Sequence, residues 1–234
     1  MAKEKSFASD STTMAVNARF SASVVWLAGG GAHLCFLYTF IIVFNYFQCV
    51  STKYKFANPE GIYFVTFAVV HWADVFTRNI YRDILLDSFR YCIKEKGLII
   101  YGFVIMSNHV HLVIGKKGDQ SLSAIMRDMK KFSSVKIIRE IIENPAESRK
   151  LWMLKLFADT GKANTNNTHY QLWQQQNHPI EIEPHSNMFD QKLNYIHQNP
   201  VKAGWVNEPS AYVYSSAANY EEKGGILGEV EVAH

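Results

Sequence analysis

The feature that most constrains this chain is a pair of histidines two residues apart in the apolar run IMSNHVHLVI, residues 105–114. The run is rich in β-branched residues, which favours a strand. Side chains alternate between the two faces of a strand, so His109 and His111 project from one face. The apolar residues at the alternating positions point to the other face. Two neutral imidazoles held side by side suit a divalent metal ion. The run therefore predicts a strand with one face in a core and the other at a metal site.

A second segment about eighty residues later strengthens that interpretation. It has the sequence KLNYIHQNPVKAG, residues 192–204, and places Asn199 four residues after Tyr195. Residues four apart are neighbours on a helix, so the phenol and the amide would share a face. Pro200 disfavours helical geometry at the preceding residue, so we expect a helix over 188–198 with Asn199 at its frayed end. Without this partner segment, a His-x-His pair is more often structural than metal-binding.

The spacing of apolar residues predicts the surrounding fold. Alternating or continuous apolar runs indicate strands, and a spacing of three or four indicates helices. The expected elements are strands over 62–70, 98–106, 109–115 and 180–182, and helices over 74–96 and 122–142. This order is typical of an α+β fold of the ferredoxin-like or RRM-like type, with an antiparallel sheet and helices on one face. Residues 144–170 are expected to be irregular, which would make an unusually long loop.

Composition and charge limit the class of protein. The chain has 234 residues, of which 48% are hydrophobic and 19% charged, so it is long enough for one globular domain with an extension. A formal charge of +3 is too small to indicate a nucleic-acid partner by itself. Basic residues do follow the histidine pair closely, where they would neutralise phosphates or form a solvated helix face. The candidate DNA-binding residues are Lys116, Lys117, Arg127, Lys130 and Lys131.

Three widely spaced cysteines, with no CxxC pair, argue against a disulfide framework or a structural zinc site, and a reducing, cytoplasmic setting is expected. Residues 1–52 are harder to interpret because 32–50 form an apolar run with no Lys, Arg, Asp or Glu. Three interpretations stay open: a membrane anchor, a buried or interfacial element, or upstream sequence included by a misplaced start codon. We favour the last, since the organised pattern begins near Ser51. The expected organisation is an extension (1–52), one domain (53–222) and a flexible tail (223–234).

The two motifs together resemble those of a known family. NHVHLVI, residues 108–114, is similar to the His-hydrophobic-His motif of the single-tyrosine HUH transposases, the insertion-sequence-200-like family. YIHQNPVKAG, residues 195–204, resembles the tyrosine helix of that family, and more particularly of the REP-associated tyrosine transposases. The likeness extends from about Lys53 to Tyr220 and implies the HUH endonuclease fold. It singles out Tyr195 among twelve tyrosines, with Tyr170 as the nearest competitor.

The resemblance implies a role for each matching residue. Tyr195 would be the nucleophile, and His109, His111 and Asn199 would hold Mg²⁺ or Mn²⁺. The implied activity is cleavage and rejoining of single-stranded DNA through a 5′-phosphotyrosine intermediate, with a hairpin beside the cleavage site. The site would be shared within a homodimer or complete in a monomer, and no protein partner is implied. Two alternatives are a non-catalytic hairpin-binding module and a metal-dependent hydrolase in which Tyr195 is structural.

Overall fold

The computed structural model describes residues 56–163, 169–175, 177–183 and 186–233. These residues belong to one compact unit that spans 51–234. The interpretations of residues 1–52, including the apolar run 32–50, lie outside the described residues. Within them, no helix is both long enough and apolar enough to cross a membrane.

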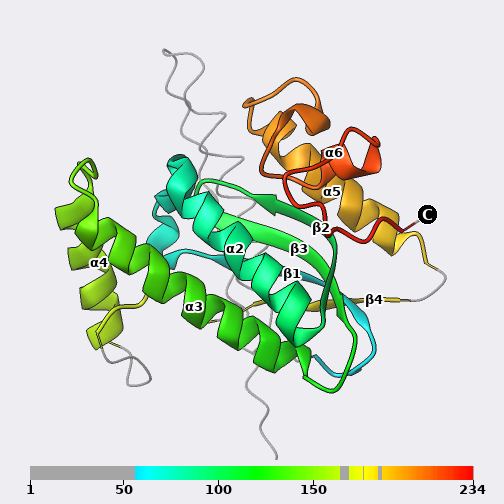
Figure 1. Ribbon diagram of the computed structural model, residues 1–234, viewed down its shortest axis with the longest axis horizontal. Helices are drawn as coiled ribbons and strands as arrows, with labels where there is room; N and C mark the ends of the chain where they lie inside the picture. Colours follow the sequence, from blue (N-terminus) through cyan, green and yellow to red (C-terminus); the bar gives the residue numbers. More distant parts are fainter. Residues whose placement is uncertain (1–55, 164–168, 176, 184–185, 234) are drawn as a thin grey trace, which may run out of the picture. The chain divides into compact units, whose positions relative to one another are not determined.

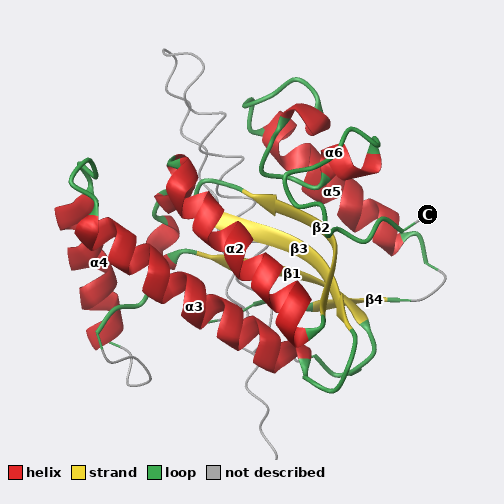
Figure 2. Ribbon diagram, viewed as in Figure 1, coloured by secondary structure: helices red, strands yellow, loops and turns green. Residues whose placement is uncertain are grey.

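A four-stranded antiparallel sheet forms the centre of the unit (Figures 1 and 2). Its strands lie in the order β2-β3-β1-β4, which is the ferredoxin-like arrangement that the element order predicts. The strands are β1 (Ile62–Ala68), β2 (Leu98–Ile105), β3 (His109–Lys116) and β4 (Ile180–Ile182). The central pair, β1 and β3, places Thr66 opposite His111 and Ala68 opposite His109.

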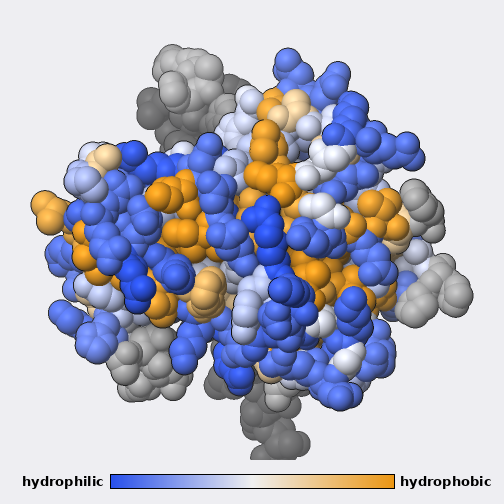
Figure 3. All heavy atoms as spheres, in the orientation of Figure 1, coloured by the Kyte–Doolittle hydropathy of each residue, from blue (hydrophilic) through white to orange (hydrophobic). Residues whose placement is uncertain are grey.

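Two long helices, α2 (Asn79–Lys96) and α3 (Leu122–Glu143), cover one face of this sheet (Figure 1). The alternation predicted for β3 is confirmed on this side, because Val110, Leu112 and Ile114 are fully buried. Phe103 of β2 pairs with Leu112 and contacts Phe89 of α2 with ring centroids 6.0 Å apart. In the view over α2 and α3, hydrophilic side chains predominate with apolar ones between them (Figure 3).

A third helix, α5 (Met188–Lys202), packs on the other face over β2 and β3. Gly102 allows this close approach, since a Cβ there would lie 2.6 Å from Leu193 Cδ1. The expectation that the helices lie on one face thus holds for the two crossover helices, while α5 occupies the face that carries the histidines.

The predicted end of α5 at residue 198 is wrong, because Pro200 lies inside the helix. Leu193, Ile196 and Pro200 are all buried and recur at helical spacing, so packing of the last turn offsets the backbone hydrogen bond that proline cannot donate.

Further differences from the sequence expectations lie in the connections. Short 3-10 turns, η1 (Val70–Trp72) and η2 (Val75–Thr77), separate β1 from α2, which therefore begins at residue 79 rather than 74. The stretch expected to be irregular contains α4 (Lys150–Lys162), which buries Met153, Phe157 and Gly161 at intervals of four. That spacing is a helical signal.

The C-terminal residues contain η3 (Pro209–Ala211) and α6 (Ala217–Tyr220), and the chain then returns along the sheet edge. The flexibility expected of residues 223–234 stays a prediction, but residues 223–233 do contact the rest of the fold. Leu227 is fully buried, and the Glu231 N–H donates to the Ile100 carbonyl at 2.9 Å. A buried leucine and a backbone bond to a strand are contacts that oppose fraying of a chain end.

Candidate active site

The two histidines of β3 lie side by side on the face of the sheet opposite α2 and α3. Their ring centroids are 4.9 Å apart and the rings are nearly perpendicular. His111 is only 3% exposed, and its Nδ1 lies 2.7 Å from the Thr66 hydroxyl on the neighbouring strand. His111 Nε2 is buried and has no hydrogen-bond partner among the described residues. A buried ring nitrogen without a partner is a feature that calls for a ligand.

Burial keeps both rings neutral. It lowers the pKa of His109 to about 4, although the nearby Asp74 carboxylate acts in the opposite direction. Burial also lowers the pKa of His111 well below its usual value, and the charges of His109 and Lys192 add to that effect. At neutral pH each imidazole therefore keeps one unprotonated nitrogen, which is the form that coordinates a metal ion.

His109 is held by the side chain of the residue before it. The Asn108 Oδ1 atom lies 2.7 Å from His109 Nδ1. The Asn108 amide nitrogen donates to the Trp72 carbonyl at 3.1 Å and to Asp74 Oδ1 at 3.0 Å. The indole of Trp72 also meets the His109 ring edge-on at 5.7 Å.

Tyr195 reaches the same place from α5. Its ring centroid lies 5.2 Å from that of His111 and 5.9 Å from that of Phe64. Leu193 and Ile196 on either side of it pack into the core, which leaves Tyr195 at the margin of the helix with 39% of its surface exposed. Among the described residues, none forms a hydrogen bond with its hydroxyl.

Asn199 lies one turn further along α5. Its side-chain nitrogen donates to the Tyr195 carbonyl at 2.8 Å, and this leaves the amide oxygen as an acceptor. In the described residues there is no cluster of three or more His, Cys, Asp or Glu that would hold a metal ion. A metal here would therefore rest on two imidazoles and a neutral donor such as the Asn199 amide oxygen.

Two lysines that the sequence argument did not single out accompany Tyr195. Lys202 Nζ lies 5.7 Å from the centroid of the Tyr195 ring, and Lys192 Nζ lies 4.9 Å from that of Phe64. Offsets of −3 and +7 from Tyr195 place both lysines on its side of the helix. That spacing is readable in the sequence and would have found them.

The structure does not bring the predicted DNA-binding residues together with this site. Lys116 lies at the opposite end of β3 from His109, where it is paired with Glu60, and Lys117 is next to it. Arg127, Lys130 and Lys131 belong to α3 on the other face of the sheet. Lys130 Nζ donates inside the fold to the Gln174 carbonyl and the Asn177 side chain, and burial lowers its pKa to about 8. Their role in DNA binding stays a prediction.

Comparison with known proteins finds one matching family model and solved structures that are similar to this chain. Residues 61–175 match the family model described as "Transposase IS200 like". The chain is similar to the protein of the solved structure titled "Structure of the REP associates tyrosine transposase bound to a REP hairpin", with 17% identity and a TM-score of 0.54. That match covers 79% of this chain and 93% of the other.

A putative transposase from Deinococcus radiodurans R1 is 16% identical, with a TM-score of 0.38, over 63% of this chain and 97% of the other. No curated protein matches the chain. The family match includes His109 and His111 but ends before Tyr195. The assignment of the tyrosine therefore depends on its position in the fold.

Proposed function

We propose that this chain, whose residues 61–175 belong to the IS200-like transposases, cleaves and rejoins single-stranded DNA with Tyr195 as the nucleophile. One observation carries the proposal. The Tyr195 ring lies 5.2 Å from that of His111, which lies 4.9 Å from that of His109, and all three belong to one chain. An exposed phenol beside two neutral imidazoles is a suitable arrangement for phosphoryl transfer.

In the proposed reaction, the Tyr195 oxygen attacks the scissile phosphorus and loses its proton. The bond from phosphorus to the 3′ oxygen breaks, and that oxygen takes up a proton to become a free 3′-hydroxyl. The 5′ side stays attached as a phosphotyrosine, which keeps the energy of the phosphodiester bond. A 3′-hydroxyl of another strand then reverses the step without a nucleotide cofactor.

The residues present fit a divalent metal ion. His111 Nε2 is buried without a protein partner, and the Asn199 amide oxygen remains an acceptor. His109, His111 and Asn199 would hold Mg²⁺ or Mn²⁺, and imidazole donors favour the manganese ion of the two. When bound, the ion supplies positive charge that stabilises the charge developing on the phosphate.

The DNA is proposed to approach Tyr195 along α5. Lys202 lies over the Tyr195 ring and Lys192 over the neighbouring Phe64 ring, and both would contact phosphates beside the scissile bond. The similar REP-associated protein was solved with a REP hairpin, so a hairpin beside the cleavage site is the proposed substrate class. Because Tyr195 reaches the histidines of its own chain, the proposal does not need a second subunit to complete the site.

A covalent-capture experiment tests the proposal. The full chain is incubated with Mn²⁺ and a pool of labelled single strands, each with a hairpin flanked by randomised nucleotides. Denaturing electrophoresis then separates protein–DNA adducts from free DNA. We expect an adduct with the wild-type chain and none with Tyr195→Phe. Tyr91→Phe is the matched control, because Tyr91 is half exposed on α2, and it should form the adduct normally.

Other outcomes would reject the proposal. Hairpin binding without an adduct, at every metal concentration tried, would support a non-catalytic binding module. Mn²⁺-dependent cleavage that persists in Tyr195→Phe would support a hydrolase that uses water.

A further inference from the structure

The amide of Asn108 is fixed in one orientation by its neighbours. Its nitrogen lies 3.1 Å from the Trp72 carbonyl and 3.0 Å from Asp74 Oδ1, and both of these atoms are acceptors. Rotating the amide by 180° would replace both hydrogen bonds with repulsive contacts between oxygens. The amide oxygen must therefore be the atom that faces His109.

We infer that Asn108 is a positioning residue that fixes the tautomer of His109. An amide oxygen only accepts, so the contact of 2.7 Å between Asn108 Oδ1 and His109 Nδ1 requires a proton on Nδ1. The lone pair of the neutral ring is then on Nε2. Since ligand histidines depend on a second hydrogen bond for ring orientation and tautomer, Asn108 prepares His109 to coordinate through Nε2.

The two acceptors that orient Asn108 are themselves held in place. His71 and Trp72 both have positive φ values, 54° and 55°, a backbone conformation that is strained for residues other than glycine. This turn directs the Trp72 carbonyl to Asn108 and the indole to His109. Backbone strain of this kind persists only where the surrounding contacts require it.

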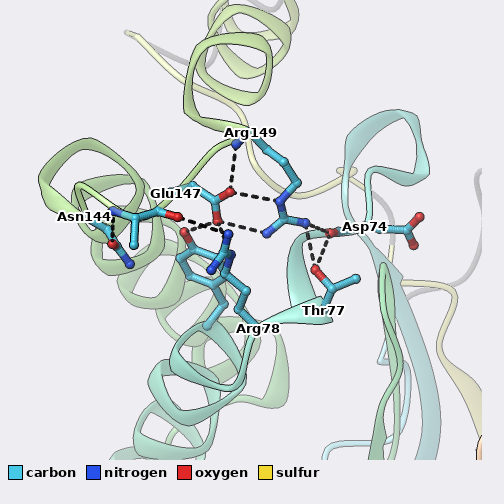
Figure 4. Close-up of polar contacts among 8 residues, drawn as sticks. Asp74, Thr77, Arg78, Asn144, Glu147 and Arg149 are labelled. Atoms are coloured by element: carbon cyan, nitrogen blue, oxygen red, sulfur yellow. Dashed lines mark hydrogen bonds and ion pairs between the residues drawn. The ribbon is translucent and has the colours of Figure 1, made fainter.

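Asp74 is held from its opposite side. Arg149 Nη1 donates to the Asp74 carbonyl at 2.6 Å and to Thr77 Oγ1 at 2.7 Å. The other nitrogens of the same guanidinium form a bidentate pair with Glu147, whose side chain is fully buried. Figure 4 shows the carboxylate of Asp74 directed away from Arg149. The arginine thus fixes the backbone of Asp74 and leaves its carboxylate for Asn108.

In the part of the chain that the structure describes, the second histidine, His111, does not have a hydrogen-bond partner that fixes its tautomer. The partner of His111 Nδ1 is the Thr66 hydroxyl, which both donates and accepts. That contact is compatible with either tautomer. The structure therefore assigns tautomer control to Asn108 at His109 and leaves His111 free to respond to the ligand.

The tautomer is measured directly on the metal-free chain. Long-range ¹H–¹⁵N correlation spectra of histidine-labelled protein at pH 7.5 with EDTA distinguish protonated Nδ1 from protonated Nε2. We expect protonated Nδ1 at His109 in the wild-type chain and in Asp74→Asn, which keeps an acceptor for the Asn108 amide. We expect Asn108→Leu to populate protonated Nε2. Asn58→Leu removes an amide from an exposed turn and should leave His109 unchanged.

The role toward the metal rests on the proposed function and has its own measurement. Mn²⁺ affinity, followed by water-proton relaxation, should fall about 10- to 100-fold in Asn108→Leu, as is usual when a ligand histidine loses the hydrogen-bond partner of its other ring nitrogen. It should stay near the wild-type value in Asp74→Asn.

The outcomes separate the two proposals. Two results would overturn tautomer control without any use of DNA. One is protonated Nε2 at His109 in the wild-type chain, and the other is a His109 tautomer in Asn108→Leu that does not differ from that of the wild-type chain. Unchanged Mn²⁺ affinity in Asn108→Leu would overturn the role toward the metal. If both measurements agree with expectation but no DNA adduct forms, the proposed function fails and this inference stands. If Asn108→Leu does not fold, the wild-type spectrum and Asp74→Leu decide the question.

Discussion

Burial of His109 makes the stability of the fold depend on pH in a way that one substitution can isolate. Burial lowers the pKa of this histidine to about 4 in the folded chain, against an ordinary value of 6.5. Between these values the unfolded chain binds a proton that the folded chain does not, so the free energy of unfolding falls as pH falls. The full loss, about 3 kcal/mol, develops as pH drops from 6.5 through 4.

The expected change is measurable over a narrower range. Between pH 7.5 and pH 5.0 His109 alone should reduce the free energy of unfolding by about 2 kcal/mol. His111 and His197, whose pKa values burial also lowers, contribute with the same sign and are present in every variant. The difference between the wild-type chain and His109→Gln at the two pH values therefore isolates His109.

The assay is urea unfolding at 25 °C with EDTA, followed by circular dichroism. His109→Gln should lose about 2 kcal/mol less than the wild-type chain on acidification. His169→Gln, a substitution at an exposed histidine, should behave as wild type. Equal losses in wild type and His109→Gln would refute the argument that partial burial keeps His109 neutral in the fold.

Three further substitutions test other parts of the structure. Glu147→Gln removes a fully buried charge from between two arginines and should lower the free energy of unfolding by about 3 kcal/mol. Urea titration measures this change, and a value within experimental error of zero would contradict the buried network. Lys202→Met removes the cation beside Tyr195 and should slow adduct formation by at least about tenfold, since a charge-assisted hydrogen bond contributes about 1.5–3 kcal/mol. Lys202→Arg keeps the charge and should retain most of the rate. Gly102→Val places side-chain atoms where Leu193 now lies, so Leu193 and α5 should move away from β2 and adduct formation should fall about 100-fold. An unaltered rate of adduct formation would show that this contact does not position α5.

The half of the site on the sheet could be predicted from the sequence because strand periodicity is a local property. Alternation along β3 determines which residues face the core, and the structure confirms it at Val110, Leu112 and Ile114. The strand order also follows from the order of elements and from the short connection between β2 and β3. One histidine pair thus located both a core face and a candidate site.

The errors share a physical cause, which is that tertiary packing overrides local preference. Pro200 predicts the end of a helix, but its own burial stabilises the last turn. The composition of the segment after residue 222 suggests a loose tail, but Leu227 in that segment is buried, and no local sequence pattern predicts its burial. The helix α4 carries a regular spacing of buried residues, but the exposed Leu151 and Trp152 obscure it.

The polar network around the site could not be predicted, because its members are distant in sequence. Glu147 accepts from Tyr81, 66 residues away, and Asn108 donates to Asp74, 34 residues away. Charged residues in a stretch expected to be irregular are ordinarily assigned to the solvated surface, and nothing local distinguishes a carboxylate that two arginines enclose. Lys130, which local charge pattern assigns to a DNA-facing surface, donates its hydrogen bonds to groups that are likewise distant in sequence, Gln174 and Asn177.

The two halves of the site are attached to the fold by different means, and this difference decides what each motif determines. The histidines belong to a central strand, and hydrogen bonds to Asn108 and Thr66 hold their rings. Tyr195 belongs to a helix whose approach to the sheet depends on Leu193 lying against Gly102, where a larger residue would leave no room. Neither motif includes that glycine, so the motifs supply the candidate groups and the contact at Gly102 bears on the separation between them. A chain that kept both motifs but carried valine at residue 102 should therefore retain the paired histidines on the sheet and lose the placement of Tyr195 beside them.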